Sequence, residues 1–409
     1  HKKACFPIRT KNRLDSLEEL VPGENQLEIV SGSHVQPIKI TYKKNENPFV
    51  VRIIYMTDST GATDFQTPRE NDPQNFRGKL DTAMKLMQTF TAERLNDLGF
   101  GRKTFNLELD ENGDVVVHVF RGQKTAEEYY AMNDQLWYRV IYGEIREQFP
   151  MHNGRNLVIP AYTRFDAETK RPKGHTALGG GAGLALFGGG DLFTWPDSLN
   201  ETVVAMTDTT PIDVDHFHDD SVGRSNYWGA LSTTLGAALH ELGHTFDLPH
   251  TNHVHDIMTR GHDRFNRAFI VREAPHKRNP NWYDFRDDEI GMWAPVSAYP
   301  LVVNRFFADS EPVKEEILAG KDNENRPRAY LDKETDEVVV TAPAGIQYVG
   351  AFCDSRIQWY YGPALGEEAP TEYRVLLSDV MKNCTPGAKK VDFQIRDKNG
   401  LYFGLGIGW

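Results

Sequence analysis

Three histidines and one glutamate between residues 240 and 250 have the types and spacing of a zinc site beside a catalytic base. His240 and His244 lie four residues apart, so on a helix both imidazoles face one side and can reach one metal ion. Glu241 points off that side, where it can act as a general base instead of a ligand. The pattern predicts metal-assisted hydrolysis, with a peptide bond as the expected target.

A helix must hold these residues, and its period is visible in the sequence. Apolar residues recur at helical spacing on the side opposite His240 and His244, so one side should pack while the other faces a cleft. These residues are Leu231, Leu235, Ala238, Leu239, Leu242 and Phe246.

The third ligand depends on where this helix ends. Pro249 disfavours helical geometry at Leu248, so we expect the chain to leave the helix near Asp247 and to turn His250 back toward the metal. His250 is therefore the predicted third ligand. Asp247 is the alternative, because one more helical turn would place it on the face of His240 and His244.

The spacing of the three histidines, followed by Met258, resembles the metzincin clan of zinc endopeptidases. The resemblance implies that one Zn²⁺ is bound by His240, His244 and His250, and that Glu241 is the base. It also implies that Met258 underlies the site in the tight turn Asp256-Ile257-Met258-Thr259. Members of the clan usually have Gly at the position of Asp247, since the turn needs positive φ; Asp is among the few residues that tolerate it.

A wider block resembles an uncharacterised eukaryotic family of metallopeptidases, some of which carry a jacalin-like lectin domain. The block runs from Asn226-Tyr227-Trp228 through Met258-Thr259-Arg260-Gly261 to Asp263-Arg264-Phe265-Asn266-Arg267. The similarity covers roughly the middle half of the chain. It supplies no substrate, so a protein or peptide substrate is inferred from the zinc motif alone.

The composition excludes some classes of partner. The chain has 409 residues and a net charge of -12, which argues against a general nucleic-acid or anionic-membrane partner. No apolar stretch is long enough to span a bilayer. The three cysteines, Cys5, Cys353 and Cys384, are too few for a disulfide-rich secreted scaffold, although Cys353 and Cys384 can pair. We predict a cytoplasmic protein; secretion stays open because the native N-terminus is not visible.

The predicted fold class is α+β, a metzincin-like zinc catalytic domain with an additional all-β, sandwich-like module. The catalytic domain spans residues 48–310, with a buried strand at 49–55, a long helix at about 75–98 and a strand at 156–162. A polar linker follows at 311–336 and the β module at 337–409. In residues 1–47, short runs at 27–30 and 38–42 are predicted to join that module, which could bind protein or carbohydrate.

The glycine-rich segment at residues 179–190 lacks the spacing of a phosphate-binding loop. Two interpretations remain open. The segment is either a glycine-flanked strand or loop that borders the cleft, where an extended substrate would bind, or a mobile surface loop.

A second cluster of possible metal ligands precedes the helix. Carboxylates and imidazoles crowd residues 213–220, and a second ion near Asp215 to Asp220 is one interpretation; a solvated acidic loop is the commoner outcome. The cluster comprises Asp213, Asp215, His216, His218, Asp219 and Asp220.

Two functions from different classes fit the sequence. In the first, the protein is a zinc-dependent endopeptidase that uses Glu241 to activate water. In the second, it is a catalytically weak or inactive zinc-containing scaffold that binds a ligand through its β module. Glu241 favours the enzyme, because a structural zinc site has no need of an adjacent base.

Overall fold

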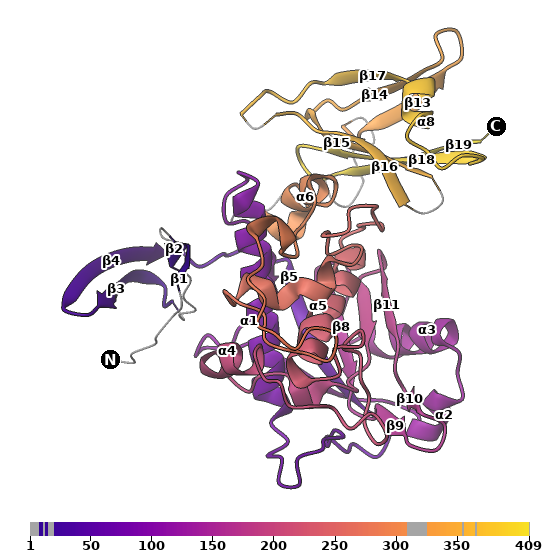
Figure 1. Cartoon of the computed structure of the whole chain (residues 1–409). Coiled ribbons are helices and arrows are strands. Elements are labelled where there is room, and N and C mark those ends of the chain that lie inside the picture. Colours follow the sequence, from indigo (N-terminus) through magenta and orange to yellow (C-terminus); the bar gives the residue numbers. More distant parts are fainter. Residues whose placement is uncertain are drawn as a thin grey trace.

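The computed structural model describes residues 8–10, 13–14, 20–308, 325–353, 356–364 and 366–408. Within these ranges the chain is a mixed α/β structure with several sheets (Figure 1). Cys5 and residues 311–324 of the predicted linker lie outside the described residues. None of the described helices is both long and apolar enough to cross a membrane.

A six-stranded sheet lies at the centre of the larger part of the molecule. Its order is β11, β12, β8, β5, β6, and β7 also pairs with β5. All pairs are parallel except that of the edge strand β11 with β12. The strands are β5 (Val50–Thr57), β6 (Asn106–Leu107), β7 (Val117–Arg121), β8 (Gly154–Pro160), β11 (Ala177–Gly180) and β12 (Leu184–Phe187).

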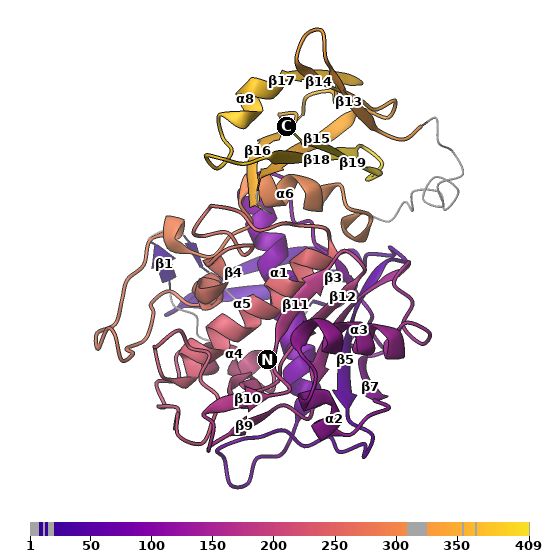
Figure 2. The ribbon, with the colours of Figure 1, turned by 90° about the vertical axis from the view of Figure 1, so that its right-hand side faces the viewer.

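Helices cover both faces of this sheet (Figure 2). Side chains alternate along β5, so Val51, Ile53 and Tyr55 pack in one core with α1 (Phe76–Asp97) and α5 (Tyr227–Thr245). Ile54 and Met56 pack in a second core with α3 (Asp134–Ile145), next to α2 (Ala126–Tyr130). Burial on both faces explains the continuous apolar run of β5. The helix predicted at 75–98 is confirmed as α1, whose N-cap is Asn75.

Shorter elements complete this part of the chain. They are the hairpin β9 (Arg164–Asp166) and β10 (Arg171–Lys173), the helices α4 (Thr202–Ala205) and α6 (Pro295–Val302), and the 3-10 helices η1 (Leu192–Thr194), η2 (Leu199–Glu201), η3 (Gly261–Ala268), η4 (Asp287–Glu289) and η5 (Arg305–Phe307).

The strands between residues 328 and 408, here called the C-terminal unit, form two antiparallel sheets above α6 (Figure 1). One sheet has the order β13, β14, β17 and the other β16, β15, β18, β19. The unit also contains one short helix, α8 (Leu377–Met381). Its strands are β13 (Arg328–Asp332), β14 (Glu337–Thr341), β15 (Ile346–Cys353), β16 (Arg356–Tyr361), β17 (Glu372–Leu376), β18 (Lys390–Asp397) and β19 (Tyr402–Gly408).

The first strand of this unit corrects the predicted linker. β13 lies within residues 311–336, which the sequence analysis takes as polar linker. Charged residues surround this short strand, so its sequence looks like a polar linker. Its Ala329 is nevertheless buried against the rest of the unit. Pairing with β14, rather than local hydrophobicity, makes this segment a strand.

Cys353 and Cys384 form a disulfide within the C-terminal unit. Disulfides persist in oxidising compartments and are rare in the cytosol. The pairing that the sequence left open is thus present, and the cytoplasmic location stays a prediction.

The N-terminal strands differ from expectation. β3 (Gly23–Ser31) and β4 (His34–Tyr42) pair with each other in a sheet of two, and among the described strands neither pairs with the C-terminal unit. The hairpin stands away from that unit in both views (Figures 1 and 2). Two shorter strands precede it, β1 (Ile8–Thr10) and β2 (Arg13–Leu14), which also pair with each other.

Candidate metal centre

Helix α5 carries two of the predicted ligands near its C-terminal end. It begins after Asn226, whose side chain accepts a hydrogen bond from the Gly229 amide, a standard N-cap. The apolar stripe predicted from the sequence is buried in the main core. His240 and His244 lie four residues apart, with ring centroids 4.8 Å from each other.

The helix ends at Thr245 with Phe246 as its C-cap, and the next residue reverses the chain. Asp247 has φ of 64°, so the predicted positive φ at this position is confirmed. After this turn, His250 returns to the helix, and its Nε2 lies 3.2 Å from Nε2 of His240. His240, His244 and His250, here called the histidine triad, each offer one ring nitrogen, and these three nitrogens lie within 4.8 Å of one another.

Asp247 lies outside this ligand group. Its carboxylate pairs with Arg396 of β18, with Nη2 to Oδ2 at 2.9 Å. The structure therefore brings together the predicted set with His250 and gives Asp247 a different partner.

The ring orientations of two histidines fit a zinc ion. The Nδ1 of His240 donates to the Ile257 carbonyl at 2.7 Å, and the Nδ1 of His244 donates to the Leu248 carbonyl at 2.7 Å. These bonds fix the tautomer that leaves each Nε2 lone pair free for a metal. Burial lowers the pKa of all three imidazoles, which keeps them in the neutral, metal-binding form. Three neutral imidazoles converging on one point suit Zn²⁺.

Glu241 lies beside the triad but is not a member of it. Its side chain is 7% exposed. Burial raises its pKa to about 8, while a hydrogen bond from the Gly179 amide acts in the opposite direction. A cation held by the histidines would favour the carboxylate further.

Met258 lies in a tight turn beneath the helix. The turn is closed by the Thr259 amide, which donates to the Asp256 carbonyl at 2.9 Å, and Met258 is fully buried. Its sulfur lies so close to Gly243 that a Cβ there would be 2.5 Å from Sδ. The Asp256 carboxylate accepts hydrogen bonds from the Met258 amide and the Ser297 hydroxyl, which fixes the turn.

Parts of the glycine-rich segment lie in the strands β11 and β12, whereas its role in lining a substrate stays a prediction. β11 lies directly against α5: a Cβ on Gly179 would be 2.1 Å from the Glu241 carbonyl oxygen. Only glycine allows this approach. The edge strand of the sheet therefore borders the triad and its carboxyl neighbour.

The acidic cluster before α5 is used in other contacts. His216 bonds Asp213 at 2.7 Å, Lys170 bonds Asp215 at 2.9 Å, and His218 bonds Asp191 at 2.5 Å. Across the described ranges, the histidine triad is the one group of three such side chains close enough to share an ion. The possible second ion near Asp215 to Asp220 has no such ligand set there.

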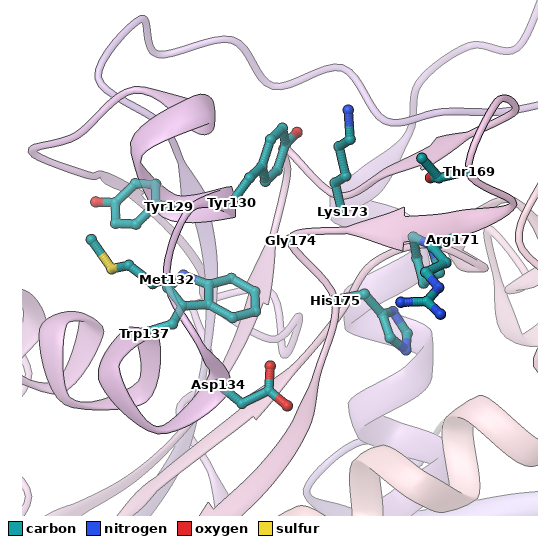
Figure 3. A pocket seen from close by; sticks show the side chains of 11 residues that line it. Tyr129, Tyr130, Met132, Asp134, Trp137, Thr169, Arg171, Lys173, Gly174 and His175 are labelled. Carbon is teal, nitrogen blue, oxygen red and sulfur yellow. The ribbon is translucent and has the colours of Figure 1, made fainter.

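A cavity of about 510 Å³ lies near the start of β11 and is separate from the triad, none of whose members lines it. Its walls come from α2, the start of α3 and the β10 region (Figure 3). Tyr130, Trp137, Arg171, Lys173 and His175 are among its lining residues. The cavity is therefore no part of the metal centre.

Sequence reasoning missed the residues that support the site from a distance. The contacts of four groups could not be predicted from the spacing of any motif. These groups are the Ile257 carbonyl, the Leu248 carbonyl, Gly179 and Arg396. The glycine run at 179–190 was the one available signal, since repeated glycines mark close backbone approach.

The histidine triad marks the chain as a candidate metalloprotein. Comparison with known proteins supplies its family. OgpA from Akkermansia muciniphila has a similar fold, with a TM-score of 0.52, 16% identity, and coverage of 90% of this chain and 95% of OgpA. A catalytically inactive form of OgpA, at 15% identity, was solved with an O-glycopeptide substrate. The profile of the family described as "Putative peptidase family" matches residues 6–347, so the chain belongs to this peptidase family.

Two yeast relatives carry the name "Putative zinc metalloproteinase". The protein from Schizosaccharomyces pombe is 30% identical over 303 residues, which is 67% of this chain and 48% of the relative. The protein from Saccharomyces cerevisiae is 27% identical over 313 residues, which is 68% of this chain and 43% of the relative. The matched region thus spans less than half the length of either relative.

Proposed function

We propose that the chain is a zinc-dependent endopeptidase of the metzincin type. His240, His244 and His250 are the ligands in this proposal, and Glu241 is the base. The supporting observation is that three imidazole nitrogens converge within 4.8 Å beside a buried carboxyl group outside their set. Three protein ligands leave a fourth position for water or substrate, as in catalytic zinc sites.

A zinc ion in this site would act as a Lewis acid toward the scissile carbonyl and make water a stronger acid. Glu241 takes one proton from the water molecule as the water oxygen attacks the carbonyl carbon. When the C–N bond breaks, the same side chain gives this proton to the leaving nitrogen. One water is consumed, and one carboxyl group and one amine are formed.

The edge strand gives the substrate a place to bind. β11 pairs in antiparallel fashion with β12 on one side, and within the described residues no strand pairs with its other side. The Gly179 amide of β11 donates a hydrogen bond to the Glu241 carboxyl group. An extended peptide can add to such an edge through main-chain hydrogen bonds. We therefore propose that the substrate lies along β11, with its scissile bond beside Glu241.

The test compares the zinc-loaded wild type with Glu241→Gln on a peptide library. The library should include O-glycosylated peptides, because OgpA was solved with one. Both proteins should bind about one zinc per chain, and the variant should lose about 10²–10⁴-fold in hydrolysis. Equal cleavage by the zinc-loaded variant would reject Glu241 as the base. No cleavage by the wild type would favour the binding scaffold.

A further inference from the structure

The segment that carries the third histidine is held by the C-terminal unit. The Ile357 amide, in β16, donates to the His250 carbonyl at 3.0 Å, and His250 and Arg356 pair as in a parallel sheet. β16 thus begins as a strand partner of the histidine segment. More than 100 residues of sequence separate these two segments.

Side chains reinforce this pairing. Arg356 Nη1 donates to the Thr251 carbonyl at 2.9 Å, and the Asn252 amide group donates to Gln358 Oε1 at 2.7 Å. Three consecutive residues, beginning at His250, are therefore bonded to three consecutive residues of β16.

A second anchor holds the other end of the same turn. Arg396, in β18, is 3% exposed. It donates to the Asp247 carboxylate at 2.9 Å and to the Phe246 carbonyl at 3.3 Å. Asp247 is the residue whose positive φ reverses the chain. The turn from Phe246 to Asn252 is thus bonded to the C-terminal unit at both ends.

These anchors matter because His250 lacks the support that the other two histidines have. His240 and His244 are each fixed by an Nδ1 hydrogen bond to a carbonyl. Among the described residues, His250 has no corresponding bond, and its side chain is less buried than that of His240. Its ring position therefore depends on its backbone, which β16 and Arg396 hold.

We propose that Arg356 and Arg396 are positioning residues for the third metal ligand, so that zinc affinity and the packing of the C-terminal unit are coupled. This rests on the proposed function only in that the histidine triad binds zinc. Coupling is reciprocal: the unit strengthens zinc binding, and bound zinc stabilises the contact between His250 and β16.

The test measures the zinc dissociation constant of the full chain by chelator competition. Arg396→Met should weaken zinc binding about 10–100-fold, the range typical of residues that orient ligands. Arg396→Lys, which keeps the charge, should recover part of this loss. The control is Arg374→Met in β17, because Arg374 pairs only with Glu337 and Glu372 among the described residues; its zinc affinity should equal that of the wild type.

Amide exchange on the wild type gives a second readout that needs no variant. Zinc should slow exchange of the Ile357 amide, which bonds the His250 carbonyl, more than exchange in the β13–β14–β17 sheet. The inference would be overturned if a folded Arg396→Met variant kept the zinc affinity of the wild type. It would also be overturned if zinc did not change the exchange rate of the Ile357 amide. A wild type that binds no zinc would reject both this inference and the proposed function, whereas tight wild-type binding with an unchanged variant rejects this inference alone.

Discussion

At the scale of single residues, the chemistry depends on which side chain completes the ligand set. His250 lies 3.2 Å from His240, Nε2 to Nε2, whereas Asp247 bonds Arg396. We expect His250→Ala to weaken zinc binding by more than about 100-fold, because it removes a ligand. Asp247→Asn, which still tolerates positive φ, should cost about 10-fold or less. Chelator competition measures both, and the reverse order would restore Asp247 as the ligand.

Asp220 should make stability depend on pH. Burial, with a contribution from Asp191, raises its pKa from 3.8 to about 6. A carboxyl with a raised pKa binds its proton more tightly in the folded state, so it lowers stability as the pH rises from about 4 to about 6. Asp220→Asn removes this penalty and should be more stable than the wild type by about 1–3 kcal/mol at pH 7.5.

Denaturant unfolding at several pH values checks this expectation. The difference between Asp220→Asn and the wild type should shrink as the pH falls from about 6 to about 4, and it should vanish below about pH 3, where both side chains are neutral in both states. A difference that persists unchanged at pH 4 would mean that the substitution acts through packing and not through ionisation.

Sequence alone predicted the residues of the site whose geometry is local. His240, Glu241 and His244 share one helix, and Pro249 with Asp247 explains the return of His250, so the spacing within residues 240–250 is enough to predict this set. Gly179 and Arg396 contact the C-terminal end of α5, although they lie about 60 and 150 residues from it in the sequence. Such contacts are set by how the elements pack, which no local pattern encodes.

At the scale of elements, the contact between β11 and α5 depends on one missing side chain. A Cβ on Gly179 would be 2.1 Å from the Glu241 carbonyl oxygen, whereas one on Gly143 in α3 meets nothing within 4 Å. We expect Gly179→Ala to destabilise the protein by about 1–3 kcal/mol, because strand and helix must separate. The control Gly143→Ala should be neutral or stabilising by up to about 1 kcal/mol. Thermal unfolding of both variants measures these effects. A Gly179→Ala variant as stable as the wild type would contradict the close packing of β11 on α5.

The periodic elements were easier to predict than the pairing of strands. α1 shows its limits in the sequence through Asn75 and its helical period. The strand β13 and the partner of β3 and β4 could not be found this way, because a strand is defined by a distant partner and not by its own residues. The same reason explains why the glycine run left two interpretations open until β11 and β12 were seen.

At the scale of the whole molecule, the N-terminal hairpin is separable from the rest. β3 and β4 pair with each other, while Asn47 holds the start of the central sheet through a 2.7 Å bond to the Arg305 carbonyl. Removal of residues 1–44 keeps this bond. We therefore expect unchanged amide exchange in β15 and β18 and unchanged zinc affinity. Faster exchange in those strands would show that the hairpin supports the C-terminal unit after all.

If His240, His244 and His250 form one zinc site with an open position, anomalous diffraction from zinc-soaked crystals at the zinc edge should locate the ion between them. We expect a single strong peak about 2.0–2.1 Å from Nε2 of each of the three histidines, with Glu241 beside it but outside the ligand set. A peak within bonding distance of Asp247 and not of His250, or a peak near Asp215 to Asp220 with none at the triad, would rule out this zinc site.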